Sequence, residues 1–272
     1  SCFGTSVESE SCNPPRNLDL LHKYGKIPSE ATSFGALITA SETSSRLLFE
    51  QGIVQLYNFN SDEAQRNFKA CLSIDSSNLM CTWALSYSHC TNLNRFVTEE
   101  KEVSYGIKLN KAMRDLMDTK KILYTDFELV LAQLLLSRWP SSIDEWREYG
   151  HEHFDRAYLV AVETYMREQG YLTPLLAGNI DNIKDQEEQV VILQSIYIDI
   201  VMTCDRWSYY NIPSQNEANM RDSALSTMDE HYILLEKTLK EDKQDVYTLM
   251  LGLLSLRPQH TFINHLYIHM TE

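Results

Sequence analysis

Residues 48–71 read LFEQGIVQLYNFNSDEAQRNFKAC, and this stretch decides the fold. Apolar residues recur at helical spacing on both sides of an Asn-rich break, which indicates two helices joined by a short turn. Small and aromatic residues stand where such helices would touch, because Gly52 is followed by Ala64 after 12 positions, by Phe68 after 4 more and by Cys71 after another 3. The stretch therefore predicts a helix-turn-helix unit with closely packed helices.

This unit resembles the tetratricopeptide (TPR) repeat, in which a small residue of the first helix meets an aromatic residue of the second. A shift of 34 residues carries Gly52 onto Ser86, another small residue, and 34 residues is the length of a TPR repeat. The resemblance is clearest over residues 45–118. It implies one regular unit, part of a second, and further helical hairpins after them.

Later blocks of the chain are similar to those of a family of large TPR proteins. These blocks are Asp155-Arg156-Ala157-Tyr158, the set Tyr197, Asp199, Met202 and Trp207, and Asn264 to Glu272, which reads NHLYIHMTE. Asp199 stands where the family carries a Glu. The resemblance implies a helical-repeat fold without a settled activity, and it predicts that the chain continues beyond residue 272 in a longer protein.

Composition also favours helices over strands. The 272 residues include only 9 Gly and 7 Pro, which leaves few turn-forming residues for a sandwich or barrel. We predict an all-α fold, a TPR-like right-handed superhelix of hairpins over 33–272, preceded by an irregular arm over 1–32. The predicted helices span 43–58, 61–73, 78–91, 98–117, 120–138, 142–169, 187–204, 216–240, 245–256 and 262–272.

The charge balance excludes two classes of partner. A formal net charge of −14 repels phosphate backbones and anionic lipids, and no basic stripe offsets it, so nucleic acid is not an expected partner.

The longest apolar run, Val190 to Met202, is too short to cross a bilayer and contains Gln194 and Asp199. The sequence therefore predicts no transmembrane segment.

The six cysteines leave the redox state open. Cys2 and Cys12 lie close together in the irregular arm and would suit a disulfide. The alternative for the others is that they are free thiols buried in helices, and these are Cys71, Cys81, Cys90 and Cys204. A disulfide in the arm would favour a secreted or organelle-lumen location over the cytoplasm.

A histidine-rich helix near the end is the strongest candidate for chemistry. His265, His269 and Glu272 share one helix face at spacings of four and three residues. Two imidazoles and a carboxylate could hold a divalent ion such as Zn²⁺, with Asp199 as an added ligand or an outer hydrogen-bond acceptor. The alternative is polar packing of the imidazoles across a helix interface.

Stacked helical hairpins usually bind peptides or proteins on their concave face. We therefore predict an interaction or scaffold protein that binds a protein or peptide partner, within a larger assembly, and the negative charge favours a basic partner. The predicted partner-facing residues are Gln51, Gln55, Asn58, His89 and Asn92. The alternative is a metal-dependent enzyme or metal-binding protein that uses the His/His/Glu helix.

Overall fold

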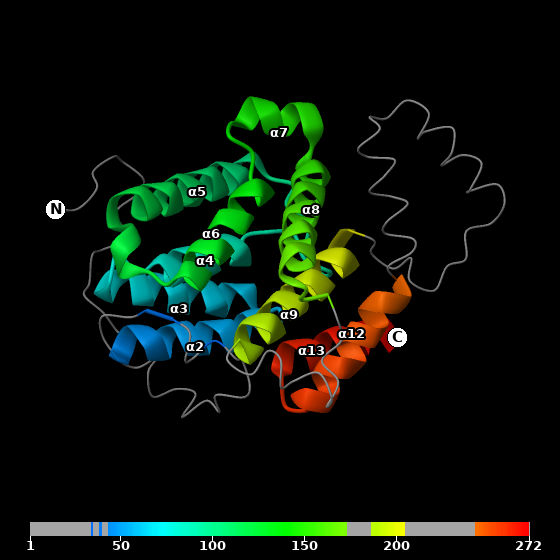
Figure 1. The fold of residues 1–272 in the computed structure, drawn as a ribbon. Coiled ribbons are helices and arrows are strands. Elements are labelled where there is room, and N and C mark those ends of the chain that lie inside the picture. Colours follow the sequence, from blue (N-terminus) through cyan, green and yellow to red (C-terminus); the bar gives the residue numbers. More distant parts are fainter. Residues whose placement is uncertain (1–33, 35–37, 40–42, 173–185, 205–242, 272) are drawn as a thin grey trace.

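In the computed structural model the described residues are 34, 38–39, 43–172, 186–204 and 243–271 (Figure 1). Over these ranges the chain is all-α and contains no strand. The α-helices are α2 (Thr43–Tyr57), α3 (Ser61–Ile74), α4 (Leu79–Ser88), α5 (Glu100–Lys120), α6 (Asp126–Leu135), α7 (Ile143–Tyr149), α8 (His151–Gln169), α9 (Glu187–Cys204), α12 (Lys243–Leu256) and α13 (Thr261–Thr271), and the short 3₁₀ helices are η2 (Lys121–Leu123) and η3 (Leu136–Arg138). The predicted helix 216–240 and the predicted arm 1–32 lie outside the described residues.

The first hairpin packs as its sequence predicts. Helices α2 and α3 are joined by a short turn over residues 58–60, and they contact each other closely. A β-carbon added at Gly52 would lie 2.4 Å from the ring of Phe68, so this position admits only glycine without movement. Phe68 is fully buried and also contacts Phe49 of α2. The close approach of the two helices thus depends on the missing side chain at Gly52.

We expect Gly52→Ala to lower the free energy of unfolding by about 1–3 kcal/mol, because the added methyl group overpacks the fully buried ring of Phe68. This cost opposes the roughly 1 kcal/mol that alanine gains over glycine in a helix interior. Urea unfolding followed by circular dichroism measures the change. Ser104→Ala, at an exposed site of α5, is the control, and an equal effect of both changes would contradict the close-packing argument.

Capping and breaking residues account for several helix ends. Thr125 and Glu128 form a reciprocal capping box at the start of α6, and the Ser142 side chain accepts a hydrogen bond from the Glu145 amide at the start of α7. Gly170 ends α8 in a left-handed conformation with φ of 72°. Helix α12 ends at Leu256, two residues before Pro258. These caps satisfy backbone groups that the helix ends leave unpaired.

Two predicted helices are wrong in their extent. The helix predicted over 142–169 is two helices, because Gly150 adopts φ of 74° between α7 and α8. The helix predicted over 120–138 is a central α-helix, α6, flanked by η2 and η3. Glycine adopts a positive φ at little cost. The break between α7 and α8 therefore depends on the backbone conformation of Gly150, which the spacing of apolar residues does not reveal.

Helix α9 forms the centre of the fold. Every residue from Val190 to Thr203 is buried, which explains why this segment reads as an almost continuous apolar run. Helix α8 packs on α9, and α12 and α13 contact it as well (Figure 1). None of the helices in the described ranges has the length and apolarity to cross a membrane.

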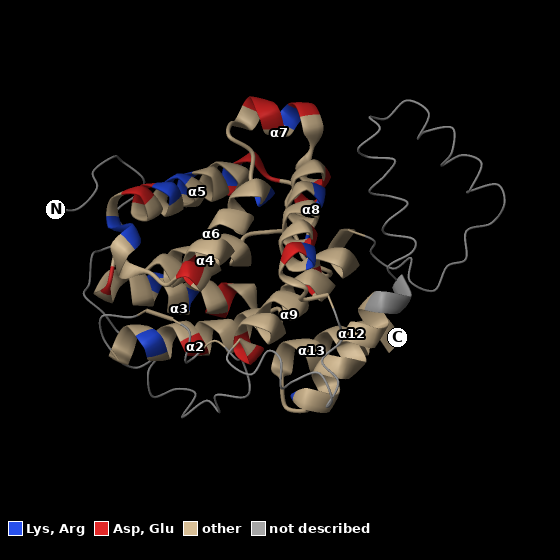
Figure 2. Ribbon diagram, viewed as in Figure 1, with Lys and Arg blue, Asp and Glu red and all other residues tan. Residues whose placement is uncertain are grey.

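Helix α13 returns to the beginning of the chain. It packs against α2, where the rings of Tyr57 and Phe262 stack with centroids 4.3 Å apart. Figure 2 shows that α13 carries no Lys, Arg, Asp or Glu, whereas α5 and α7 carry many charges. The uncharged helix thus lies at an interior contact, and the charged helices lie where the fold meets solvent.

Candidate functional site

A polar cleft lies between the α2–α3 turn and the segment that joins α4 to α5. Its volume is about 470 Å³, which is within the range of ligand pockets, roughly 300–1,000 Å³. The lining side chains are mostly amides and charged groups, and they are Phe59, Asn60, Ser61, Asp62, Gln65, His89, Asn92, Asn94, Arg95 and Glu102. A cleft with this lining can both donate and accept hydrogen bonds.

His89 is the least satisfied residue of the cleft. Its Nδ1 and Nε2 atoms are both buried and have no hydrogen-bond partner within the part of the chain that the structure describes. Burial lowers the pKa of His89 from 6.5 to about 4, helped by the positive charges of Arg95 and Lys69. The imidazole is therefore neutral at pH 7 and presents one donor and one acceptor without partners, at a cost of about 1–3 kcal/mol for each unsatisfied group.

Two sides of the cleft are held by local interactions. Arg95 donates a hydrogen bond of 2.9 Å to the carbonyl of His89 and forms an ion pair with Glu102, which joins the loop to α5. On the other side, Phe59 adopts φ of 55°, which is unusual for a residue other than glycine. The Asn60 side chain, next in sequence, donates a hydrogen bond of 2.9 Å to Gln55.

The predicted partner-facing residues fall into three groups. His89 and Asn92 line the cleft. Gln55 touches its edge through Asn60, and Asn58 is exposed but uses its amide to cap the Val54 carbonyl. Gln51 is only 2% exposed, so its side chain belongs to the interior and not to a partner-facing surface. The expectation for Gln51 was therefore wrong, because a polar residue type does not show which helix face is buried.

The predicted metal ligands are only partly brought together. His265 and His269 are neighbours, with 3.2 Å between their Nε2 atoms. Among the described residues, however, no group of three or more His, Cys, Asp or Glu side chains is placed to hold a metal ion. Asp199 therefore does not join the two histidines in a three-ligand set, and Glu272 lies outside the described residues.

Asp199 instead takes part in a buried polar cluster that the sequence did not predict. The Tyr87 hydroxyl donates a hydrogen bond of 2.5 Å to Asp199, and burial followed by the Asp199 charge raises the pKa of Tyr87 well above 10. Arg138 lies beside them and is fully buried. Its guanidinium donates hydrogen bonds to Asp155 at 2.8 Å and to the Thr91 carbonyl at 2.7 Å.

Aromatic rings enclose this guanidinium, which faces the rings of Tyr87 and Tyr158 at 5.2 and 5.1 Å from their centroids. The cluster thereby connects α4, η3, α8 and α9. Its interactions are with other parts of the same chain, which indicates that it stabilises the packing of these helices. We therefore assign it a structural role.

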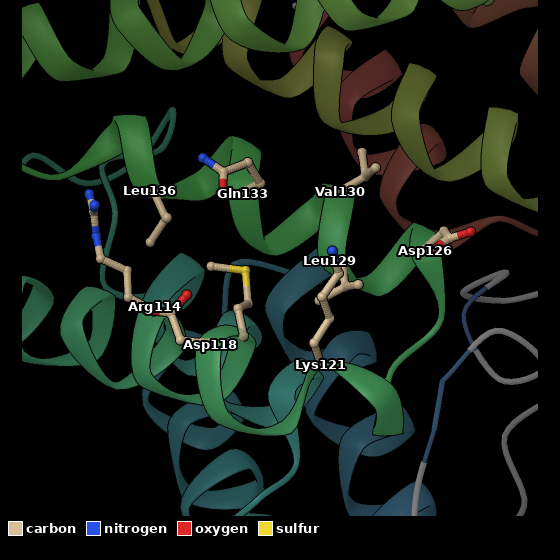
Figure 3. Close-up of a pocket in the computed structure, with 9 residues that line it drawn as sticks. Arg114, Asp118, Lys121, Asp126, Leu129, Val130, Gln133 and Leu136 are labelled. Carbon is tan, nitrogen blue, oxygen red and sulfur yellow. The ribbon is translucent and has the colours of Figure 1, made fainter.

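A second depression lies between α5 and α6, with a volume of about 530 Å³ (Figure 3). Arg114 and Asp118 line one side of it, and Val130 and Gln133 line the other. None of its lining residues has a buried polar atom without a hydrogen-bond partner. This groove therefore offers a ligand less than the polar cleft does.

Comparisons of the chain with family models, with curated proteins and with solved structures find no match. The cleft residues that the sequence did not identify, Asn60, Gln65, Asn94 and Arg95 among them, come from turns and connecting segments. Two features of the sequence pointed towards them, namely the Asn-rich turn at 58–60 and the polar segment that follows Cys90.

Proposed function

We propose that this chain is a TPR-like interaction module that binds a peptide segment of a protein partner in the polar cleft. The helical hairpin with a glycine at its closest contact supports a repeat architecture, since TPR units pack through small residues at this place. Such arrays commonly serve as binding surfaces for other proteins.

The observation that carries this proposal is the pair of unsatisfied nitrogen atoms on His89. Both nitrogen atoms are buried in the free chain, so a peptide reaches them only after the ring turns into the cleft, where its one donor and one acceptor match the N–H and C=O groups of a peptide backbone. Amide side chains on both sides of the cleft, including Asn60 and Asn92, can extend the same pattern. An extended peptide would thus satisfy groups that the protein alone leaves unpaired.

Charge suggests the chemistry of the partner. Asp62 lines the cleft, where Glu102 is already paired with Arg95, and the whole chain has a formal charge of −14. Both features attract a basic side chain and speed the approach of a basic partner. We therefore propose a peptide that places a Lys or Arg next to the residues bound by His89 and Asn92.

The location that fits this proposal is an oxidising compartment. Cys71 and Cys81 form a disulfide between α3 and α4, and such bonds persist mainly in secreted proteins and organelle lumens. The expectation of free thiols at these two positions was wrong. Cys90 is a buried free thiol as expected, and Cys2 and Cys12 lie outside the described residues.

Peptide selection tests the proposed binding site. We expect a random peptide library displayed on phage to yield Lys- or Arg-containing peptides that bind the intact chain, with affinities measurable by fluorescence polarisation. His89→Ala and Asn92→Ala should each weaken the selected peptide about tenfold or more, because each removes a central hydrogen-bonding group worth roughly 1–2 kcal/mol.

Arg114→Ala is the matched control, because it alters the other groove and leaves the cleft intact. Peptide affinity should not change in this variant. A peptide that binds the His89 and Asn92 variants as tightly as the parent chain would exclude the cleft, and failure to select any peptide would count against the proposed function.

A further inference from the structure

Two imidazoles face each other at the contact between α13 and the first hairpin. The Nε2 atoms of His265 and His269 are 3.2 Å apart, and the rings are stacked with centroids 4.9 Å apart. Both side chains are half-buried. Imidazole nitrogens bind such ions at metal–nitrogen distances of about 2.0–2.1 Å. Two nitrogens in adjacent coordination positions are then about 2.9–3.4 Å apart, so the observed distance between the two Nε2 atoms suits chelation of one ion.

The hydrogen bonding of His265 prepares one of these nitrogen atoms for a metal. Its Nδ1 lies 2.9 Å from the carbonyl oxygen of Tyr57. A carbonyl oxygen can only accept, so Nδ1 carries the proton, and the Nε2 lone pair of the neutral ring accepts the 3.2 Å hydrogen bond from His269 Nε2 that a metal ion would replace. This arrangement, with one ring nitrogen donating to a carbonyl, is the usual one for metal-binding histidines, because it fixes the tautomer and the ring orientation.

The pair is also held in place by its surroundings. The ring of Phe59 packs against His265 at 4.4 Å and against His269 at 5.8 Å between centroids. The carbonyl that orients His265 belongs to α2, 208 residues earlier in the chain. The imidazoles are therefore oriented by another helix as well as by their own, which lowers the ordering cost of binding an ion.

We propose that His265 and His269 form a binding site for one divalent transition-metal ion of the Zn²⁺ and Cu²⁺ class, with water completing the coordination. His265 binds through Nε2 while its Nδ1 remains bonded to Tyr57. His269 binds through Nε2 once its ring proton, which is donated to His265 Nε2 in the metal-free pair, is carried on Nδ1. Imidazole nitrogen is a preferred ligand for these ions. The site adjoins the peptide cleft through Phe59, which lines the cleft and packs on both imidazoles, but neither histidine lines the cleft and the site does not depend on the proposed function.

Metal titration of the tag-free full chain, stripped with a chelator, tests the site. We expect calorimetry to show a Zn²⁺ site whose affinity falls about tenfold or more in His265→Ala and in His269→Ala, since each loses one of two ligands. Cu²⁺ bound at the same site should show electron paramagnetic resonance couplings to two imidazole nitrogens, reduced to one in either variant.

His153→Ala is the matched control, because His153 is exposed on α8, and it should bind both metals as the parent chain does. If His265→Ala fails to fold because its bond to Tyr57 is lost, His269→Ala still decides the question, since it leaves that bond intact. The proposal is overturned if the parent chain shows no saturable binding, or if His269→Ala keeps full affinity and both nitrogen couplings.

Discussion

Arg138→Ala is expected to lower the free energy of unfolding by about 3–5 kcal/mol, the typical cost of removing one partner from a buried ion pair. The change leaves the Asp155 carboxylate, which is only 3% exposed, without its cation. It also leaves the Thr91 carbonyl without its donor and opens a space between the rings of Tyr87 and Tyr158. Urea unfolding of the parent chain and the variant measures the difference.

Two further variants separate the charge effect from the loss of volume. Arg138→Met combined with Asp155→Leu removes both charges and keeps a similar side-chain volume. This double variant should be more stable than Arg138→Ala and recover a large part of the lost free energy of unfolding, because well-packed apolar residues often replace a buried ion pair at little cost. Arg147→Ala removes an exposed arginine that pairs with Glu100 and Asp144, and it should have little effect. A small effect of Arg138→Ala would show that the cluster does not hold the helices together.

The second large effect is expected from the disulfide between α3 and α4. Cys71→Ala combined with Cys81→Ala should lower the free energy of unfolding by about 3 kcal/mol or more, because the unfolded chain gains the freedom of a loop that the bond had closed. The two cysteines are 10 residues apart in sequence, and both are fully buried. Thermal or urea unfolding under non-reducing conditions measures the loss, and mass mapping of peptides verifies the bond.

Cys90→Ala provides the matched control for this disulfide. It removes a buried sulfur of the same size that forms no disulfide, so it reports only the cost of the small cavity. A reducing agent should destabilise the parent chain and leave the double variant unchanged. Equal stability of the parent and the double variant without reductant would contradict a stabilising disulfide.

Helix positions were largely predictable because they depend on nearby residues. Apolar spacing and the stop at Gly170 act within one or two turns, and α8 ends at Gln169, directly before Gly170, as the predicted limit of 169 requires. The small residue at Gly52 was also identified correctly as a point of close contact. Gly106 was missed, although a β-carbon there would lie 2.3 Å from the ring of Trp139, because its partner lies in another hairpin.

The candidate site was predictable only in part. His89 and Asn92 were expected to face a partner, and both line the cleft. Asn60 and Arg95 were not expected, because their place in the cleft depends on how the α2–α3 turn lies beside the segment after α4. The grouping of Asp199 with the two histidines was not confirmed, since Asp199 accepts its hydrogen bond from Tyr87, 112 positions away in the chain.

The sequence by itself determined the all-α class, most helix boundaries and the glycine at the first helix contact, because each depends on interactions between residues close in the chain. Only the tertiary structure decided that Arg138 pairs with Asp155 in the interior and that His265 meets the Tyr57 carbonyl. Residue type shows that a side chain is polar, but its partner depends on how helices far apart in the sequence pack together. Burial makes these pairings necessary, because a polar group that is removed from water must find a hydrogen-bond partner within the fold.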